Sequence, residues 1–195
     1  MKTLLWFFLV MTGIPGVAAG EGKWYVLGYV GQYSPRNYVD FLFDDWKLQD
    51  EYLAALGVGR EVARCEKLLG FDVDIGLEVE GLAVSHWGDS RSYQEYVGAL
   101  NVRWHDFPWN HILPTTVGTG AGLSYATRVP DHEAVSHRGS ANLLVYLMYE
   151  ITLGLPQWPQ QSIFFRVHHR SGAFGAFDGV HGASNYPCLG FRHIF

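Results

Sequence analysis

Hydrophobic and polar residues alternate with a period of two along much of this chain. From Phe71 to Glu80 every odd position is apolar and every even position is an acid or glycine. A second run, over 143–153, again places apolar residues at its odd positions. Because successive side chains of a β-strand point to opposite faces, both runs predict strands with one apolar and one polar face. Tilted strands of about 10 residues are long enough to cross a membrane.

Weaker alternation predicts six further strands, which makes eight in all. An even number of tilted strands with an apolar outside and a polar inside is typical of a small outer-membrane barrel, and closure leaves no unpaired edge in lipid. The sequence therefore predicts an all-β, eight-stranded antiparallel up-and-down transmembrane barrel. A soluble β-sandwich is the alternative, because its strands alternate in the same way. The predicted strands are 23–33, 51–60, 71–80, 93–104, 115–126, 143–153, 161–171 and 186–195.

Charged residues fall on the face that such a barrel turns inward. Acids and arginines of different strands would meet in the lumen, where each buried charge needs a partner. Aromatic residues near the strand ends, including Trp104 and Trp158, suit the belts at the two membrane interfaces. The expected inward acids are Asp72, Asp74, Glu78, Glu80, Glu95 and Glu150, and the expected inward arginines are Arg103, Arg166, Arg170 and Arg192.

The N-terminus has the pattern of a secretory signal peptide. Lys2 precedes an apolar run over 4–11, and Val17-Ala18-Ala19 supplies small residues for cleavage. We expect residues 1–19 to be removed and residues 20–195 to form one outer-membrane β-barrel domain with both ends in the periplasm. The external loops would then be 34–50, 86–92, 127–140 and 172–185.

Composition narrows the classes of partner. The 195 residues carry a net charge of −5 without a basic cluster, which argues against a nucleic-acid partner. After the signal peptide no run of about 18 apolar residues occurs, so we expect no helical membrane anchor. The cysteines are Cys65 and Cys188. We expect the first in a turn, the second in a strand, and no disulfide between them.

The stretch 163–171 combines an apolar stripe with two reactive side chains. Apolar residues at 163, 165 and 167 share one strand face with His169 and Ser171. In the barrel this face is the lipid-facing wall near the outer end of the seventh strand. The backbones of residues i and i+2 are roughly 6.6 to 6.8 Å apart, and inclined side chains can close that gap to about 3 Å. Serine and histidine at this spacing can act as nucleophile and general base.

On these residues the chain resembles the lipid A 3-O-deacylases of the PagL type, which are eight-stranded outer-membrane barrels with a serine hydrolase site on the lipid-facing wall. The resemblance rests on Arg166, on the run from His169 to Gly172, and on a short last strand ending at Phe195. Elsewhere only the strand pattern matches. The resemblance implies the outer membrane of a Gram-negative bacterium, lipid A of lipopolysaccharide in the outer leaflet as substrate, surrounding membrane lipid, and no cofactor. A homodimer is a further candidate assembly.

The resemblance assigns Ser171 as the nucleophile and His169 as the general base. The third catalytic residue of the family is a glutamate on the last strand, and the corresponding position here is Asn185. An amide oxygen can orient the imidazole but cannot neutralise the imidazolium that forms. Asp178 in the last external loop is a candidate substitute acid. Gly172 stands where the family usually has asparagine, so the oxyanion hole would depend more on backbone N–H groups.

Two other functions stay open at this point. A barrel with weak or no catalysis would serve as a structural protein, an adhesin or a binding module through its external loops. Gly88-Asp89-Ser90, together with Asp178 and His181, resembles short blocks of GDSL-type esterases, but that family needs an α/β fold. The loop 127–140 holds histidines and acids without diagnostic ligand spacing, so we expect no metal site.

Overall fold

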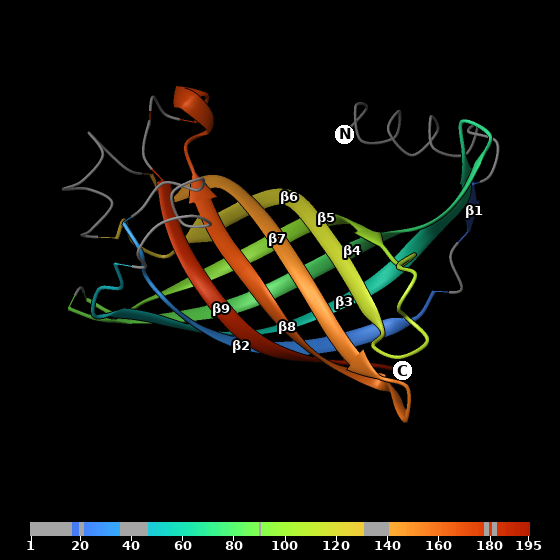
Figure 1. Cartoon of the computed structure of the whole chain (residues 1–195). Coiled ribbons are helices and arrows are strands. Elements are labelled where there is room, and N and C mark those ends of the chain that lie inside the picture. Colours follow the sequence, from blue (N-terminus) through green and yellow to red (C-terminus); the bar gives the residue numbers. More distant parts are fainter. Residues whose placement is uncertain are drawn as a thin grey trace.

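The computed structural model is an antiparallel barrel of tilted strands (Figure 1). It describes residues 17–19, 22–35, 47–89, 91–130, 141–177, 180 and 183–195. The elements are β1 (Val17–Ala19), β2 (Trp24–Gln32), β3 (Glu51–Leu68), β4 (Phe71–Gly88), β5 (Tyr93–Trp104), β6 (Thr115–Ala126), β7 (Leu143–Leu155), β8 (Trp158–Ser171), the 3-10 helix η1 (Ala173–Gly175) and β9 (Ala183–Ile194).

Eight strands close into a ring. Each of β2 to β8 pairs with the next strand, and β9 pairs back with β2, always antiparallel. The predicted eight-stranded antiparallel barrel is therefore confirmed. The β7–β8 turn and the C-terminus lie at one end of the barrel, and η1 lies at the other (Figure 1). In the described part of the chain no helix is long and apolar enough to span a membrane.

The β3–β4 hairpin is longer than predicted, with 18 residues in each strand. Beyond Arg60, β3 pairs only with β4 and with β1, which lies inside the predicted signal peptide. The β3 arm of this extension, over 61–68, does not alternate in sequence, which is why it was not predicted, whereas Phe71 to Gly76 on the β4 arm does alternate. Cys65 therefore lies in a strand, and the prediction of a turn was wrong. Both Cys65 and Cys188 are free, as expected.

The outer wall of the ring is apolar. Along β5 buried and exposed residues alternate without interruption, and the other strands turn large apolar side chains outward. In water this surface would be an exposed apolar patch far larger than monomeric soluble proteins tolerate, whereas in a bilayer it contacts lipid. The outward residues include Val26, Val30, Leu56, Val58, Leu100, Val102, Leu123, Ile151, Ile163, Leu189 and Phe191.

The lumen is filled by charges that compensate one another. Arg166, fully buried, donates to both oxygens of Glu80 at 2.7 and 3.0 Å and to Glu150 at 2.7 Å. Buried ion pairs need such complete hydrogen bonding to offset the loss of hydration. The predicted pairing inside the barrel is thus confirmed for three acids and three arginines. These are Glu78, Glu80, Glu150, Arg103, Arg166 and Arg192.

Two predicted lumen acids lie elsewhere. Asp72 is exposed on the hairpin extension, 3.9 Å from Lys67. Asp74 pairs with Arg64 at 2.7 Å on the same extension. Asp72 stands where β4 has already left the ring, whereas Asp74 lies at the rim, one residue before β4 begins to pair with β5.

A second polar layer lies nearer the η1 end of the lumen. Glu95 accepts a hydrogen bond from Ser124 Oγ at 2.6 Å and lies 2.7 Å from His86 Nε2 and 3.1 Å from His168 Nε2. Tyr29 OH lies 2.8 Å from His168 Nδ1. Both layers of the lumen are therefore occupied by side chains.

Candidate active site

Strands β8 and β9 place the predicted site residues on the outer wall. Their register pairs His169 with Asn185 and Ser171 with Ala183. The intervening residues of β8 point into the lumen, where His168 and Arg170 are buried. Strand parity accounts for this arrangement, because successive side chains of a strand point to opposite faces, so His168 faces the lumen while His169 faces outward.

His169 and Asn185 form a short hydrogen bond between directly opposed strand residues. The imidazole Nδ1 lies 2.6 Å from the amide Oδ1. Because an amide oxygen only accepts, the imidazole donates from Nδ1 and carries its lone pair on Nε2. Both side chains are buried although they lie on the outer wall, at 8% and 4% exposure. This is the tautomer that a general base acting through Nε2 requires.

Asn185 is held by pairing on both sides. Beyond its partner on β8, its carbonyl accepts the N–H of Ser34 at 2.8 Å, in a bridge to the segment that follows β2. Strand β9 begins at Ala183, earlier than the predicted 186, which brings Asn185 inside the strand and settles the direction of its side chain.

Ser171 ends β8 on the same wall and is partly exposed. Its Oγ accepts a hydrogen bond from the N–H of Ala173 at 3.2 Å. Among the described residues, Ser171 and His169 share no direct hydrogen bond. Side chains at i and i+2 of a strand lie on one face, so rotation about χ1 is enough to bring Oγ toward Nε2. Catalytic hydrogen bonds often tighten in this way only when substrate is bound.

The backbone after Ser171 is tightly constrained. Gly172 packs against the backbone of Val180, and a Cβ at this position would overlap the Val180 carbonyl oxygen. The asparagine of the family therefore does not fit this loop conformation. Ala173 follows with φ of 48°, a region that costs a residue other than glycine about 1–3 kcal/mol.

The Ala173 N–H is a candidate oxyanion donor that sequence reasoning missed. Its conformation turns this N–H toward Ser171 Oγ, and a donor next to a nucleophile is positioned to stabilise developing negative charge. No residue type reveals such a donor, because every residue except proline has an N–H and alanine carries no signal for positive φ.

Other predicted site residues lie outside the described residues. These are Asp178, the candidate substitute acid, with His181 and Ser90 of the GDSL-like blocks. A GDSL-type esterase needs an α/β fold, and the described chain is an all-β barrel. Within the described ranges, no group of three or more His, Cys, Asp and Glu residues could hold a metal ion.

An apolar groove of about 310 Å³ lies on the outer wall beside the His169–Asn185 pair. Pro187 lines it and follows Asn185 by two positions, on the same face of β9. Phe165 lines it from the outer face of β8. Further apolar walls come from Val30, Leu53, Trp87 and Leu189.

Comparison with protein-family models gives no match, and comparison with curated proteins gives none. Among solved structures, the chain is similar to the outer membrane enzyme PagL, with a TM-score of 0.56 and 13% identity over 87% of this chain and 98% of that chain. It is also similar to Neisserial surface protein A (NspA), with a TM-score of 0.50 and 10% identity over 92% and 99%. The Yersinia pestis outer membrane protein Ail gives a TM-score of 0.41 and 14% identity over 90% and 100%.

At these identities the likeness shows a shared fold. The fold is a closed eight-stranded barrel, and its outer wall is an apolar surface that only lipid can cover. The protein is therefore a β-barrel of the outer membrane of a Gram-negative bacterium.

Proposed function

We propose that the protein is a serine-type ester hydrolase of the PagL type that removes an ester-linked acyl chain from lipid A of lipopolysaccharide. The observation that carries the proposal is the 2.6 Å hydrogen bond between His169 Nδ1 and Asn185 Oδ1, with Ser171 two residues along the same wall. A buried, oriented imidazole beside a serine is an expensive arrangement for a surface that only needs to contact lipid.

The reaction needs only groups of this chain and water. Ser171 Oγ attacks the ester carbonyl while His169 Nε2 takes its proton, and the carbonyl oxygen becomes an oxyanion near the Ala173 N–H. The C–O bond to the sugar then breaks, and the imidazolium returns its proton to the departing alcohol. Water, deprotonated by the same imidazole, releases the fatty acid from Ser171.

The groove beside the site suits the acyl part of the substrate. Its walls are apolar and it opens on the surface that faces lipid. An acyl chain lying between Phe165 and Pro187 would bring its ester end toward Asn185, which lies two residues from Pro187 on β9. His169 lies opposite Asn185 on β8. An outer-leaflet lipid could thus reach the serine without leaving the membrane.

A direct assay of purified protein tests the function. Folded protein in mixed vesicles of lipopolysaccharide and phosphatidylcholine should release free fatty acid, and mass spectrometry of lipid A should show the loss of one ester-linked chain. Phosphatidylcholine should stay intact, since it provides a second ester in the same membrane. If folded and heat-unfolded protein leave lipid A equally unchanged, the hydrolase proposal fails and a structural, adhesive or binding role is favoured.

Replacing Asn185 by aspartate should raise the rate. The carboxylate keeps the hydrogen bond to Nδ1–H and also stabilises the imidazolium that forms when Ser171 is deprotonated. We expect kcat to rise by about tenfold, which corresponds to a decrease of about 1.4 kcal/mol in the activation free energy of the reaction. Initial rates of fatty-acid release check this, with Asn185→Leu, which cannot accept the hydrogen bond, as the matched variant expected to lose activity. Equal rates for all three proteins would remove Asn185 from the site.

A further inference from the structure

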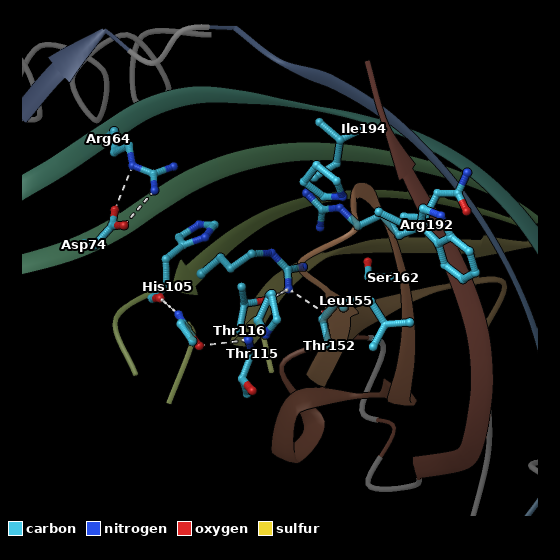
Figure 2. Close-up of a pocket in the computed structure, with 17 residues that line it drawn as sticks. Arg64, Asp74, His105, Thr115, Thr116, Thr152, Leu155, Ser162, Arg192 and Ile194 are labelled. Atoms are coloured by element: carbon cyan, nitrogen blue, oxygen red, sulfur yellow. Dashed lines mark hydrogen bonds and ion pairs between the residues drawn. The ribbon is translucent and has the colours of Figure 1, made fainter. Parts of the chain in front are cut away.

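A second cavity opens at the other end of the barrel, far from Ser171. It has a volume of about 320 Å³ and is lined by the loop 105–114, by the ends of β7 and β9, and by the beginning of β8 (Figure 2). This volume lies at the lower end of the range for small-molecule sites. Because the cavity and Ser171 lie at opposite ends of the barrel, ligand binding at the cavity does not depend on the proposed hydrolase activity.

The charged side chains at this cavity already have partners. Arg103 donates to Glu78 at 3.1 Å and to Glu150 at 2.6 Å. Arg64 pairs with Asp74 at 2.7 Å, and Arg192 also binds Glu78. A charged ligand would enter a low-dielectric site without a counter-charge, which is costly. The cavity therefore favours an uncharged ligand.

Two residues that line the cavity each hold a buried side-chain nitrogen that has no hydrogen-bond partner in the described part of the chain. These nitrogens are Arg192 Nε and His105 Nε2. Burial lowers the pKa of His105 to about 4, so its imidazole is neutral and one ring nitrogen is an acceptor. Figure 2 shows His105 and Arg192 on opposite sides of the cavity, with the hydroxyl side chains of Thr116 and Thr152 between them. Only a ligand with several polar groups could serve both sides.

The remaining walls are apolar. Trp158 stands at the rim with 62% of its surface exposed, and Leu155 and Ile194 also line the cavity. An unpartnered donor, a neutral imidazole, hydroxyl groups and an aromatic wall together match a molecule with hydroxyls on its edge and C–H groups on its faces. A hydroxyl can both donate to an imidazole nitrogen and accept from an arginine N–H.

We infer that this mouth of the barrel binds one uncharged sugar unit, with Arg192 Nε–H and His105 Nε2 bonded to its hydroxyls and Trp158 against one face of the ring. Both nitrogens are buried in the ligand-free wall, so binding requires the imidazole and the Arg192 side chain to rotate toward the sugar. The sugar is either a free monosaccharide or the end of a glycan chain, since both present the same chemistry.

A series of sugars that differ only in charge tests the inference. The full-length protein is placed in phosphatidylcholine nanodiscs, which contain no sugar detergent, and saturation-transfer NMR is recorded with glucose, the anion glucuronate and the cation glucosamine. We expect glucose to bind and the two charged analogues to bind at least about tenfold more weakly. Maltotriose distinguishes the sources, because tighter binding than glucose indicates a chain end and weaker binding indicates a free sugar.

Two tryptophan variants supply the control. Trp158→Ala should weaken glucose binding about tenfold, whereas Trp24→Ala, at the same end of the barrel but outside the cavity lining, should leave it unchanged. Both side chains are exposed, so neither substitution endangers the fold. Glucose signals equal to those of empty nanodiscs, equal binding of the charged sugars, or equal binding by both variants would overturn the inference.

Discussion

Replacement of Ser171 by alanine should lower the rate of lipid A deacylation by about 10³-fold or more. The substitution removes the oxygen that attacks the ester and leaves the barrel intact, since Ser171 is partly exposed at a strand end. In serine hydrolases, loss of one member of the catalytic unit leaves only the contributions of binding and the oxyanion hole. The measurement is the initial rate of fatty-acid release from lipopolysaccharide at saturating substrate.

An outward-facing serine elsewhere on the same barrel provides the control. Ser85 lies on the outer wall near the C-terminal end of β4, and Gln94 donates a hydrogen bond to its Oγ at 3.1 Å. Ser85→Ala should retain the wild-type rate, because this side chain is not adjacent to His169. Comparable rates for wild type and Ser171→Ala, with a measurable rate in both, would show that another group is the nucleophile.

A double variant tests whether Ser171 and His169 act as one unit. Once the nucleophile is missing, the base has no proton to remove, so Ser171→Ala with His169→Ala should be no slower than Ser171→Ala alone. Independent losses that multiply would place His169 in a separate role, such as packing against the outer wall.

The ring of eight strands was predictable because the bilayer and the lumen impose opposite demands on the two faces of each strand. For the same reason, the even-numbered positions of the strands predicted that Arg166 would face the lumen and pair with acids there. Beyond Arg60 the β3 arm of the hairpin extension has no such alternation, and so the end of β3 was predicted too early. The β4 arm does alternate there, but the strand reaches beyond the ring, and so Asp72 was wrongly placed in the lumen.

In the candidate site, the side chains could be predicted from the sequence but the backbone donor could not. The resemblance predicted that Asn185 would orient the imidazole of His169, and in the structure the two residues are directly opposed across β8 and β9. The candidate oxyanion donor, the Ala173 N–H, was not predictable, because the positive φ of Ala173 depends on how the loop packs, with Gly172 against Val180. Residue types report which side chains can meet, whereas backbone donors depend on loop conformation that no local pattern encodes.

Replacement of Arg166 by methionine should destabilise the barrel by about 3–5 kcal/mol, because it leaves buried carboxylates without their partner. Arg166 binds Glu80 and Glu150, and all three side chains are fully buried. Methionine fills a similar volume without supplying a donor. Urea-induced unfolding in phosphatidylcholine vesicles, followed by tryptophan fluorescence, gives the free energy of unfolding.

The matched control is an ion pair on the hairpin extension. Lys67→Met breaks the exposed contact with Asp72, 3.9 Å away, and should change the free energy of unfolding by no more than about 1 kcal/mol. Adding Glu80→Gln to Arg166→Met should restore part of the lost stability, since Glu80 is the carboxylate that loses its arginine, whereas Glu150 keeps Arg103. If Arg166→Met and Lys67→Met are equally mild, water must hydrate the lumen carboxylates, and the charge network would not be what holds this barrel together.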